Sequence, residues 1–551
     1  MPATAAIFHH PDAMESQKMP LAGRRAAGQS FLAGYVRHAA TDTLRCVAGS
    51  KAHIEHFAKA VGDFGWTGKV VGTMLQEPQR TAEHGAMMLP GPSLGPYSWV
   101  RRRVGPQAYS LIGITHTVST RRICTSLYDL VSAPVEDWDA IICTSKAVHS
   151  VVAGIINESA DYLSQRFGAR RMPVPQLPII PLGIDTERFA HDPEDRTRWR
   201  EKLSIAEDEV LVMSMGRRSV FEKMHPAPLM LSLQQVAEQT GTKLVLLMAG
   251  WFGDETTEKL HRDAAKEMAP DVRVEFPDGK DPDLRFSLWS AADIFALPVD
   301  NIQETFGLVP VEAMAAGLPV VCSDWNGFKD TVIDGVTGYR TRTLMARPGR
   351  GMQIANRFED QADSYHQYLG VVHQRTAVDV RDMTQALKTL VEDPDKRKTM
   401  GQAGQEHAKR CYDWSVIIPQ YQALWDDLAG RRARGMTTVP PQEGRPADPS
   451  SIDPFTLYRR YPSMAISSEM QFTAVRRVTV ADVQKMMNLS GATHLKRMVS
   501  RPEAVAGIQQ MVHDSGPLGI PDLSRDTKMA DGPVEAILMW LLKFDLIQLQ
   551  T

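Results

Sequence analysis

The sequence predicts an α/β protein with two domains, each built on a parallel sheet that helices cover on both faces. Short apolar segments recur between residues 4 and 323, and segments of helical length with one apolar face separate them. The short segments are apolar throughout, as in strands that are buried on both faces. A proline-rich stretch, 175–189, divides this alternation into two series. We therefore expect two Rossmann-like domains that face one another across a central cleft.

The first series contains segments that read as strands and a helix that is predicted to open at Gly28. The predicted strands are TAAIFHH at 4–10, YSLIGITHT at 109–117 and WDAIICTS at 138–145. The predicted helix is GQSFLAGYVRHAA at 28–40, and the stretch 175–189 is expected to be an extended crossover out of this domain.

The second series alternates more regularly between strands and helices. Its predicted strands are 209–216, 243–250, 272–276, 293–298 and 318–323. Its predicted helices are 228–239, 254–268, 284–292 and a short helix within 304–317. Ligands of open α/β sheets bind beyond the carboxyl ends of the strands, so we expect the functional site in the cleft between the two domains.

Composition divides the rest of the chain. Residues 341–378 interrupt the alternation and are interpreted as an insertion, and residues 431–453 are rich in Pro, Arg and Ser, which is typical of a linker. The predicted organisation is a first domain at 1–188, a second domain at 189–412, a helix at 413–430 that crosses back to the first domain, the linker 431–453 and a small module of unknown role at 454–551.

Charge and cysteine usage argue against several classes of protein. A net charge of −3 over 551 residues argues against a dedicated nucleic-acid binder, which would be strongly basic. The five cysteines are scattered and form no Cys-x-x-Cys pair, so we expect a cytoplasmic protein without disulfides or a zinc site. We find no signal-peptide pattern and no run of roughly 20 apolar residues, so any contact with the inner membrane face would be peripheral. Arginine pairs such as 121–122 are equally compatible with a solvated surface and with an anionic acceptor or membrane.

The stretch ETFGLVPVEAMAAGLPVV, 304–321, is almost wholly apolar but carries two glutamates. Gly307 and Pro310 are expected to set the start of a short helix, which places Glu304 in the entering loop and Glu312 in the first two turns. Unpaired backbone N–H groups and the helix dipole favour a diphosphate at such a start, with a carboxylate on either side for sugar hydroxyls. Taken alone, Glu304 is more simply a solvated loop charge and Glu312 a charge that favours the dipole.

Two further segments place polar residues at strand ends. In MGRRSVFEKM the strand ends at Gly216, so Arg217 and Lys223 would project near the cleft and neutralise a leaving nucleotide diphosphate. Arg218 is an alternative to Arg217 for this contact. Both arginines and Lys223 could also be ordinary solvated cations of a surface loop. His116 follows the strand at 109–117 on the cleft side, although a lone histidine is more often structural.

Together with NGFKDTVIDGVTGYRT, 326–341, the stretch 304–321 resembles the retaining, nucleotide-sugar-dependent glycosyltransferases of family 4, which have the GT-B fold. The Glu-x7-Glu spacing, the Phe-Gly-Leu after the first glutamate and the Glu-Ala-Met-Ala-x-Gly-x-Pro-Val-Val continuation all match. The resemblance covers roughly residues 1–430. The sequence departs from the family at Asn326-Gly327 and Asp330, where the family has a Gly-Gly pair and a glutamate.

The resemblance implies that the first domain faces the acceptor and that the second binds the donor. It implies that Glu304 contacts the donor hexose, that His116 supports the reacting centre, and that Arg217 and Lys223 hold the diphosphate. It also implies that Glu312 binds the ribose hydroxyls and that Gly279 and Lys280 lie in the base-binding loop. The implied donor-binding residues are Gly28, Gly216, Gly279, Lys280, Thr305, Phe306, Gly307, Leu308 and Glu312.

We expect neither a metal nor any other cofactor. Asp281-Pro282-Asp283 has the Asp-x-Asp form through which another class of glycosyltransferases binds its metal. Asp before Pro at a helix start is also an N-cap, and Asp393-Pro394-Asp395 repeats the tripeptide before another helix. The metal-free, front-face mechanism of the family requires neither group.

These observations predict a retaining hexosyltransferase that uses a nucleotide diphosphate sugar and a glycan, lipid-linked or small-molecule acceptor, in the synthesis of bacterial-type surface polysaccharide or glycoconjugate. A sugar-phosphate or glycogen-type synthase of the same fold would differ only in its acceptor. A catalytically silent nucleotide-sugar-binding scaffold is an alternative of another class, and the presence of Arg217, Lys223, Glu304 and Glu312 counts against it. The sequence leaves the sugar, the base, the acceptor and the oligomeric state open.

Overall fold

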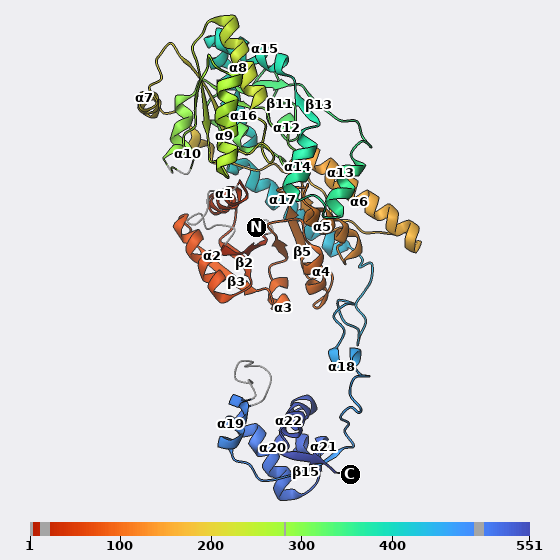
Figure 1. The fold of residues 1–551 in the computed structure, drawn as a ribbon. Coiled ribbons are helices and arrows are strands. Elements are labelled where there is room, and N and C mark those ends of the chain that lie inside the picture. Colours follow the sequence, from red (N-terminus) through yellow and green to blue (C-terminus); the bar gives the residue numbers. More distant parts are fainter. Residues whose placement is uncertain (1–3, 12–22, 280, 282, 490–500, 551) are drawn as a thin grey trace. The chain divides into compact units, whose positions relative to one another are not determined.

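The computed structural model describes residues 4–11, 23–279, 281, 283–489 and 501–550. The chain forms two compact units, Met1–Pro449 and Ser450–Thr551 (Figure 1). The first unit contains the two parallel sheets, and the second contains a small antiparallel sheet. Among the described residues, no helix combines the length and the apolar character that crossing a membrane requires.

The first sheet has parallel strands in the order β3-β2-β1-β4-β5-β6, as predicted for a doubly wound domain. The predicted strands correspond to β1, β5 and β6, whereas β2, β3 and β4 are additional. The strands are β1 Ala6–His9, β2 Thr43–Ala48, β3 Lys69–Met74, β4 Ala86–Met88, β5 Ser110–Ile114 and β6 Ala140–Ile142. The helices are α1 Gly23–His38, α2 Lys51–Asp63, α3 Pro78–Ala82, α4 Gly95–Arg102, α5 Arg121–Ser132 and α6 Lys146–Phe167.

The second sheet is also parallel, in the order β12-β11-β10-β7-β8-β9. The five predicted strands are confirmed, and β12 joins them at the edge. The strands are β7 Val210–Met215, β8 Leu244–Ala249, β9 Arg273–Glu275, β10 Ile294–Leu297, β11 Val320–Ser323 and β12 Gly338–Thr341. The helical segments are η2 Thr186–Phe189, α7 Pro193–Lys202, α8 Ala227–Thr240, α9 Glu255–Met268, α10 Leu284–Ser287, η3 Leu288–Ala291, α11 Leu308–Ala315 and α12 Phe328–Thr331.

The segment 341–378 folds as two helices on a short hairpin. Strands β13 and β14 pair antiparallel at its base, and the chain then continues into long helices. These elements are β13 Thr343–Met345, α13 Met352–Glu359, α14 Tyr365–His373, β14 Thr376–Val378, α15 Val380–Glu392, α16 Pro394–Tyr412 and α17 Trp414–Arg434.

Trp414, at the start of α17, joins the two domains. Its indole Nε1 donates to Ser30 Oγ of α1 at 2.8 Å. A Cβ at Gly34 would lie 2.3 Å from Trp414 Cγ, and a Cβ at Gly183 would lie 2.5 Å from Trp414 Cε3. Both approaches are closer than a side chain tolerates, so the two glycines make room for the indole. The helix after the second domain therefore packs back onto the first.

The predicted start of α1 is wrong. The helix begins at Gly23 rather than at Gly28, so Gly28 lies inside it. Backbone N–H groups inside a helix donate to carbonyl oxygens one turn earlier. Gly28 therefore does not provide the unpaired N–H of a helix N-terminus that was expected of it. The preceding segment, 12–22, lies outside the described residues.

The second unit has its own core. Phe472 on the central strand is fully buried and packs in one cluster with side chains such as Val505, Leu538 and Leu541. Thr479 and Asp482 cap α19 reciprocally, since Asp482 Oδ2 accepts the Thr479 N–H at 2.9 Å and Thr479 Oγ1 accepts the Asp482 N–H at 3.2 Å. The sheet order is β16-β15-β17. The elements are α18 Pro454–Leu457, β15 Gln471–Ala474, α19 Val480–Leu489, α20 Pro502–Ser515, β16 Leu518–Gly519, α21 Ile520–Thr527, α22 Asp531–Lys543 and β17 Ile547–Leu549.

Candidate active site

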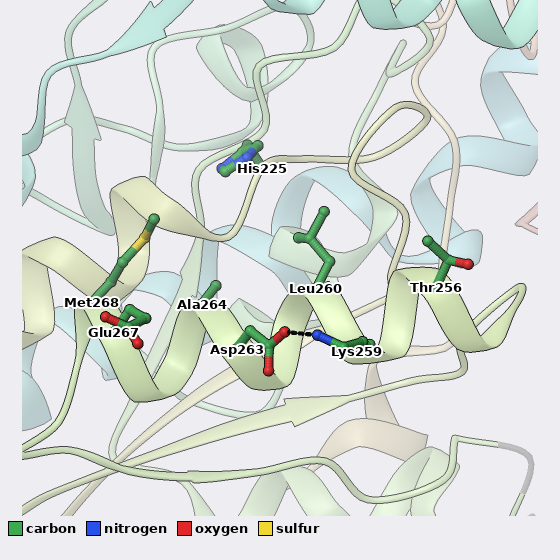
Figure 2. A pocket seen from close by; sticks show the side chains of 8 residues that line it. All are labelled: His225, Thr256, Lys259, Leu260, Asp263, Ala264, Glu267 and Met268. Carbon is green, nitrogen blue, oxygen red and sulfur yellow. Dashed lines mark hydrogen bonds and ion pairs between the residues drawn. The ribbon is translucent and has the colours of Figure 1, made fainter.

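A groove of about 460 Å³ runs along α9 of the second domain. Figure 2 shows His225 above that helix and the ion pair between Lys259 and Asp263 on it. None of the residues that the sequence predicts for the site lines this groove. A smaller pocket lies where β7 and β8 end, and Gly216, Arg217 and Lys223 are among its lining residues. Parallel α/β sheets bind ligands at this edge, so we place the candidate site there.

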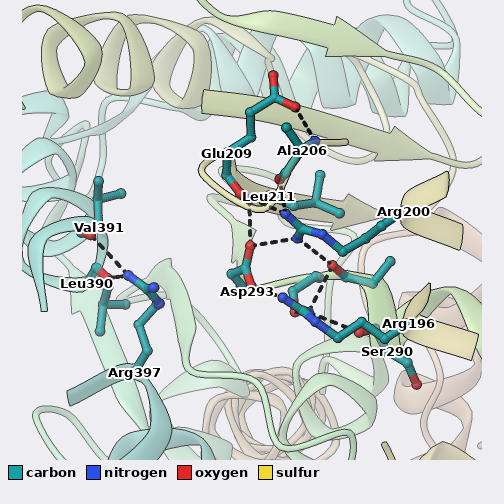
Figure 3. Close-up of polar contacts among 12 residues, drawn as sticks. Arg196, Arg200, Ala206, Glu209, Leu211, Ser290, Asp293, Leu390, Val391 and Arg397 are labelled. Carbon is teal, nitrogen blue, oxygen red and sulfur yellow. Dashed lines mark hydrogen bonds and ion pairs between the residues drawn. The ribbon is translucent and has the colours of Figure 1, made fainter. Parts of the chain in front are cut away.

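The strand that leads into the site is held at its start by Asp293. The carboxylate of Asp293 accepts hydrogen bonds from Arg196 at 2.7 Å and from Arg200 at 3.2 Å, both on α7 (Figure 3). It also accepts the Leu211 N–H of β7 at 2.8 Å. One carboxylate thus joins α7, β7 and β10, and the loop that follows β10 projects from a well-anchored strand.

That loop ends at Gly307, the N-cap of α11. Gly307 has φ of 90°, and a Cβ there would lie 2.2 Å from Phe328 Cε1, so both the backbone and the space demand glycine. The predicted helix start is confirmed, because α11 begins at Leu308. Phe306 is buried with 2% exposure. Its ring belongs to the core, and its backbone N–H is directed at the Glu304 carboxylate.

Glu304 and Lys223 form an ion pair at the mouth of this loop. Lys223 Nζ lies 2.5 Å from Glu304 Oε2, and the two side chains are 20% and 14% exposed. Burial alone would raise the pKa of Glu304, but Lys223 and the N–H groups of Thr305 and Phe306 lower it below its ordinary value. Glu304 is therefore an ionised carboxylate beside a cation, as a contact to sugar hydroxyls requires.

The two neighbouring arginines have different environments. Arg218 is buried, donates to the carbonyls of Gly250 and Pro277, and stands 4.2 Å above the Phe252 ring. Burial lowers its pKa to about 10. Arg217 is 39% exposed, pairs with Glu222 and donates from Nη2 to Gln303 Oε1 at 3.2 Å. Both arginines line the pocket, but only Arg217 is substantially exposed, whereas Arg218 is held by backbone carbonyls.

Glu312 lies on α11, near two cations. Burial raises its pKa to about 7, although Arg285 and Lys223 pull it down. The pKa of Arg285 is lowered by burial, against the opposing pull of Glu312. Lys223 lowers the pKa of both Glu304 and Glu312, so the two carboxylates lie near the same cation.

Three glycines pack together at the ends of β7, β8 and β9. A Cβ at Gly250 would lie 1.8 Å from the Gly216 carbonyl oxygen, and a Cβ at Gly279 would lie 2.7 Å from Gly250 Cα. Gly216 has φ of 148°, in the range that favours glycine. The Gly279 N–H donates to the Gly250 carbonyl at 2.7 Å, so this N–H is already engaged. Lys280 lies outside the described residues.

The first domain meets the donor-side loop directly. His116 follows β5 by two residues and is half-buried, and its carbonyl accepts the Thr305 hydroxyl at 2.8 Å. Ser145, before α6, donates from Oγ to the Thr305 carbonyl at 2.8 Å. The predicted residues His116 and Thr305 are therefore brought together.

The loop after β11 supports Glu304 in a way that the sequence pattern does not predict. Asn326 has φ of 47°, a conformation that asparagine tolerates better than most residues, and its amide donates to the Glu304 carbonyl. Asp330 accepts the Lys146 N–H of the first domain at 2.7 Å. The residues that depart from the family pattern thus brace the loop and bridge the cleft.

Asp281 makes the hydrogen bond expected of a capping aspartate, because its Oδ1 accepts the Asp283 N–H at 3.0 Å. Helix α10 itself begins at Leu284, and the Asp283 side chain makes no capping hydrogen bond to it. Asp283 also pairs with Arg198 at 2.8 Å, while Pro282 lies outside the described residues. In the described part of the chain, no three His, Cys, Asp or Glu side chains are grouped so that they could hold a metal ion.

Part of the chain is similar in sequence to known glycosyltransferases. Residues 195–343 match the family model of glycosyl transferases group 1. The lipopolysaccharide 1,2-N-acetylglucosaminetransferase of Salmonella typhimurium is 34% identical over 189 residues, which are 33% of this chain and 47% of that protein. The D-inositol 3-phosphate glycosyltransferase of Corynebacterium aurimucosum is 24% identical over 336 residues, 60% of this chain and 70% of that protein. The chain thus spans about half to two thirds of these relatives.

Among solved structures, Anabaena Alr3699/HepE in complex with UDP is similar, with a TM-score of 0.51 and 16% identity over 77% of this chain and 100% of that one. At this identity the likeness concerns the fold. The chain thus has the GT-B fold, and its residues 195–343 are similar to glycosyl transferases of group 1.

Proposed function

We propose that this chain transfers a hexosyl unit from a nucleotide diphosphate sugar to a glycan or lipid-linked acceptor, with retention at the anomeric carbon and without a metal ion. The observation that carries the proposal is the ion pair of Lys223 with Glu304 in front of α11, with Arg217 in the same pocket. Cations and a helix start favour a diphosphate, and an ionised carboxylate favours sugar hydroxyls.

In the proposed reaction the bond between the anomeric carbon and the diphosphate oxygen breaks, and the acceptor hydroxyl bonds to the same face of the sugar. The diphosphate leaves with the bonding electrons and takes up the acceptor proton. Arg217, Lys223 and the N–H groups at the start of α11 stabilise the developing negative charge. Glu304 holds the hexose, and Glu312 accepts hydrogen bonds from the ribose.

The names of the curated relatives include one acceptor of the cell surface and one small molecule. One is named for transfer of N-acetylglucosamine to lipopolysaccharide and another for transfer to D-inositol 3-phosphate. We propose a surface glycoconjugate as the class of product and a cytoplasmic site of reaction. A synthase that makes a sugar phosphate or a glycogen-type polymer would use the same donor site.

The test is a panel of UDP-, GDP- and ADP-sugars, scored by calorimetric binding and by slow hydrolysis of the donor in buffer with and without EDTA. We expect one nucleotide class to bind and to be hydrolysed equally in both buffers. Binding without hydrolysis or transfer would favour the silent scaffold. Failure of every donor to bind would contradict the proposal, and loss of turnover in EDTA would contradict its metal-free part.

A further inference from the structure

The segment 341–378, here called the insertion, lies almost wholly beyond the family match, which ends at residue 343. Figure 1 shows its helices α13 and α14 at the junction of the two domains, close to α5. The insertion contacts both sides of the cleft and the loop that carries Arg217. These three sets of contacts assign it a role in the candidate site.

The first contact reaches the first domain. The hydroxyl of Tyr365, the first residue of α14, lies 2.7 Å from Ser119 Oγ. Ser119 follows His116 in the segment beyond β5, on the cleft side. Glu359 of α13 adds an exposed ion pair with Arg121, whose Nη2 lies 4.0 Å from the carboxylate, and such a pair contributes little stability. Arg121 also donates from Nη1 to the Glu359 backbone carbonyl, so the hydroxyl contact is one of two hydrogen bonds from the insertion to this segment.

The second contact covers the loop that carries Arg217 and Lys223. The Phe221 ring lies 4.7 Å from the His366 ring, edge to face, and a Cβ at Gly370 would lie 2.8 Å from Phe221 Cδ1. His366 Nδ1 also lies 3.4 Å from Glu222 Oε1. Glu222 is the carboxylate that pairs with Arg217. Helix α14 thus packs directly on the loop that bears the cations.

The third contact anchors the end of α14. His373 is 3% exposed, and its Nδ1 lies 3.5 Å from Asp300 Oδ2. Asp300 is buried in the loop between β10 and Glu304, and its other oxygen accepts the His225 N–H at 3.4 Å. The insertion therefore packs at one end of α14 against the loop before Glu304 and contacts the first domain at the other end.

A chain of hydrogen bonds runs through these contacts to Arg217. Arg217 Nη2 donates to Gln303 Oε1 at 3.2 Å, and Gln303 Nε2 donates to the Tyr365 oxygen at 3.3 Å. Because the Tyr365 oxygen accepts from Gln303, its hydrogen can be donated to Ser119. Arginine can only donate, so the Gln303 amide has one orientation, with its oxygen toward Arg217 and its nitrogen toward Tyr365. Between Tyr365 and Ser119, either hydroxyl can be the donor.

We propose that the insertion is a clamp across the cleft and that Tyr365 is a positioning residue, which orients Gln303 and through it the Arg217 guanidinium. Glu222 pairs with Nη1 of Arg217, and Gln303 restrains the other terminal nitrogen, Nη2. Because Arg217 is 39% exposed, this second restraint narrows the rotamers that it samples, and ordering it beforehand strengthens its contact with an anion. The inference rests on the proposed function, because the anion that Arg217 meets is the donor diphosphate.

The test compares Tyr365→Phe with Tyr368→Phe, a matched variant on the same helix whose ring stacks on Phe358 at 4.4 Å. The ligand is whichever of UDP, GDP or ADP the wild type binds. We expect Tyr365→Phe to weaken diphosphate binding about fivefold, the effect of one neutral hydrogen bond, with an unchanged melting temperature. Tyr368→Phe should bind as the wild type does.

A double-mutant cycle separates positioning from a general structural effect. In an Arg217→Ala background, Tyr365→Phe should cause no further loss of affinity, because the group that it positions is gone. If Tyr365→Phe fails to fold, Ser119→Ala breaks the other end of the chain and should weaken binding in the same direction.

Equal affinity of the wild type and Tyr365→Phe, or a full further loss in the Arg217→Ala background, would overturn the inference and leave the proposed function standing. Failure of the wild type to bind any of the three diphosphates would instead overturn the proposed function.

Discussion

Lys223 Nζ lies 2.5 Å from Glu304 Oε2, and this pair joins the loop after β7 to the loop before α11. Neither residue is more than one fifth exposed, with 20% for Lys223 and 14% for Glu304. Removing one member of such a pair leaves the charge of the other unpaired and poorly hydrated. Substituting Lys223 leaves an unpaired carboxylate, whereas substituting Glu304 leaves an unpaired ammonium group.

Lys223→Ala removes the cation that we assign to the diphosphate. We expect nucleoside diphosphate affinity, measured by calorimetry, to fall by roughly 10- to 100-fold, the effect of losing a charge-assisted hydrogen bond. Transfer should slow as well. Lys259→Ala is the matched control, because Lys259 pairs with Asp263 on α9 and lines the other groove. Undiminished affinity in Lys223→Ala, or a loss confined to Lys259→Ala, would place the nucleotide elsewhere.

We expect Arg218→Ala to lower stability and Arg217→Ala to weaken diphosphate binding. Arg218 is buried and bonded to two backbone carbonyls, so its removal should lower the free energy of unfolding by about 2–4 kcal/mol. Arg217→Ala should retain the wild-type melting temperature but bind the diphosphate more weakly. Denaturant unfolding and calorimetry measure the two effects, and the reverse pattern would refute the assignment of Arg217 to the diphosphate.

Glu312 should make stability depend on pH. Its folded pKa of about 7 is raised above the ordinary 4.5, so between these values the folded protein binds more protons than the unfolded chain. Stability from this group therefore falls as pH rises from about 4.5 to about 7 and is level above that range. Glu312→Gln should remove this decline, so that its melting temperature, relative to the wild type, is higher at pH 8 than at pH 5. An unchanged difference across that range would show that Glu312 is not buried as described.

The sequence predicts the second domain well because strands such as β8 and β10 are uninterrupted apolar runs. It misses β2 and β3, where Arg45 and Lys69 break the apolar pattern, and β12, whose Arg340 is part of an edge strand. The start of α1 is misplaced because Gly28 resembles a helix-opening glycine, although the helix runs through it.

Within the site, the residues of one continuous motif are predictable and the contacts between distant segments are not. Glu304 and Gly307 are found from local pattern and resemblance. Tyr365 and Ser119 are 246 positions apart, and no local signal marks either one. The roles of Arg217 and Arg218 are likewise separated only by packing, since the two are identical residues in adjacent positions.

The most direct test of the account is Glu304→Gln, measured for both transfer and diphosphate binding, with Glu267→Gln on α9 as the matched control. The variant keeps the shape of the side chain and removes the charge that holds the sugar. We expect transfer to fall by roughly 10²-fold or more, the effect of losing one transition-state contact, while diphosphate binding survives. Wild-type turnover in Glu304→Gln would contradict the central claim that this carboxylate serves the donor sugar.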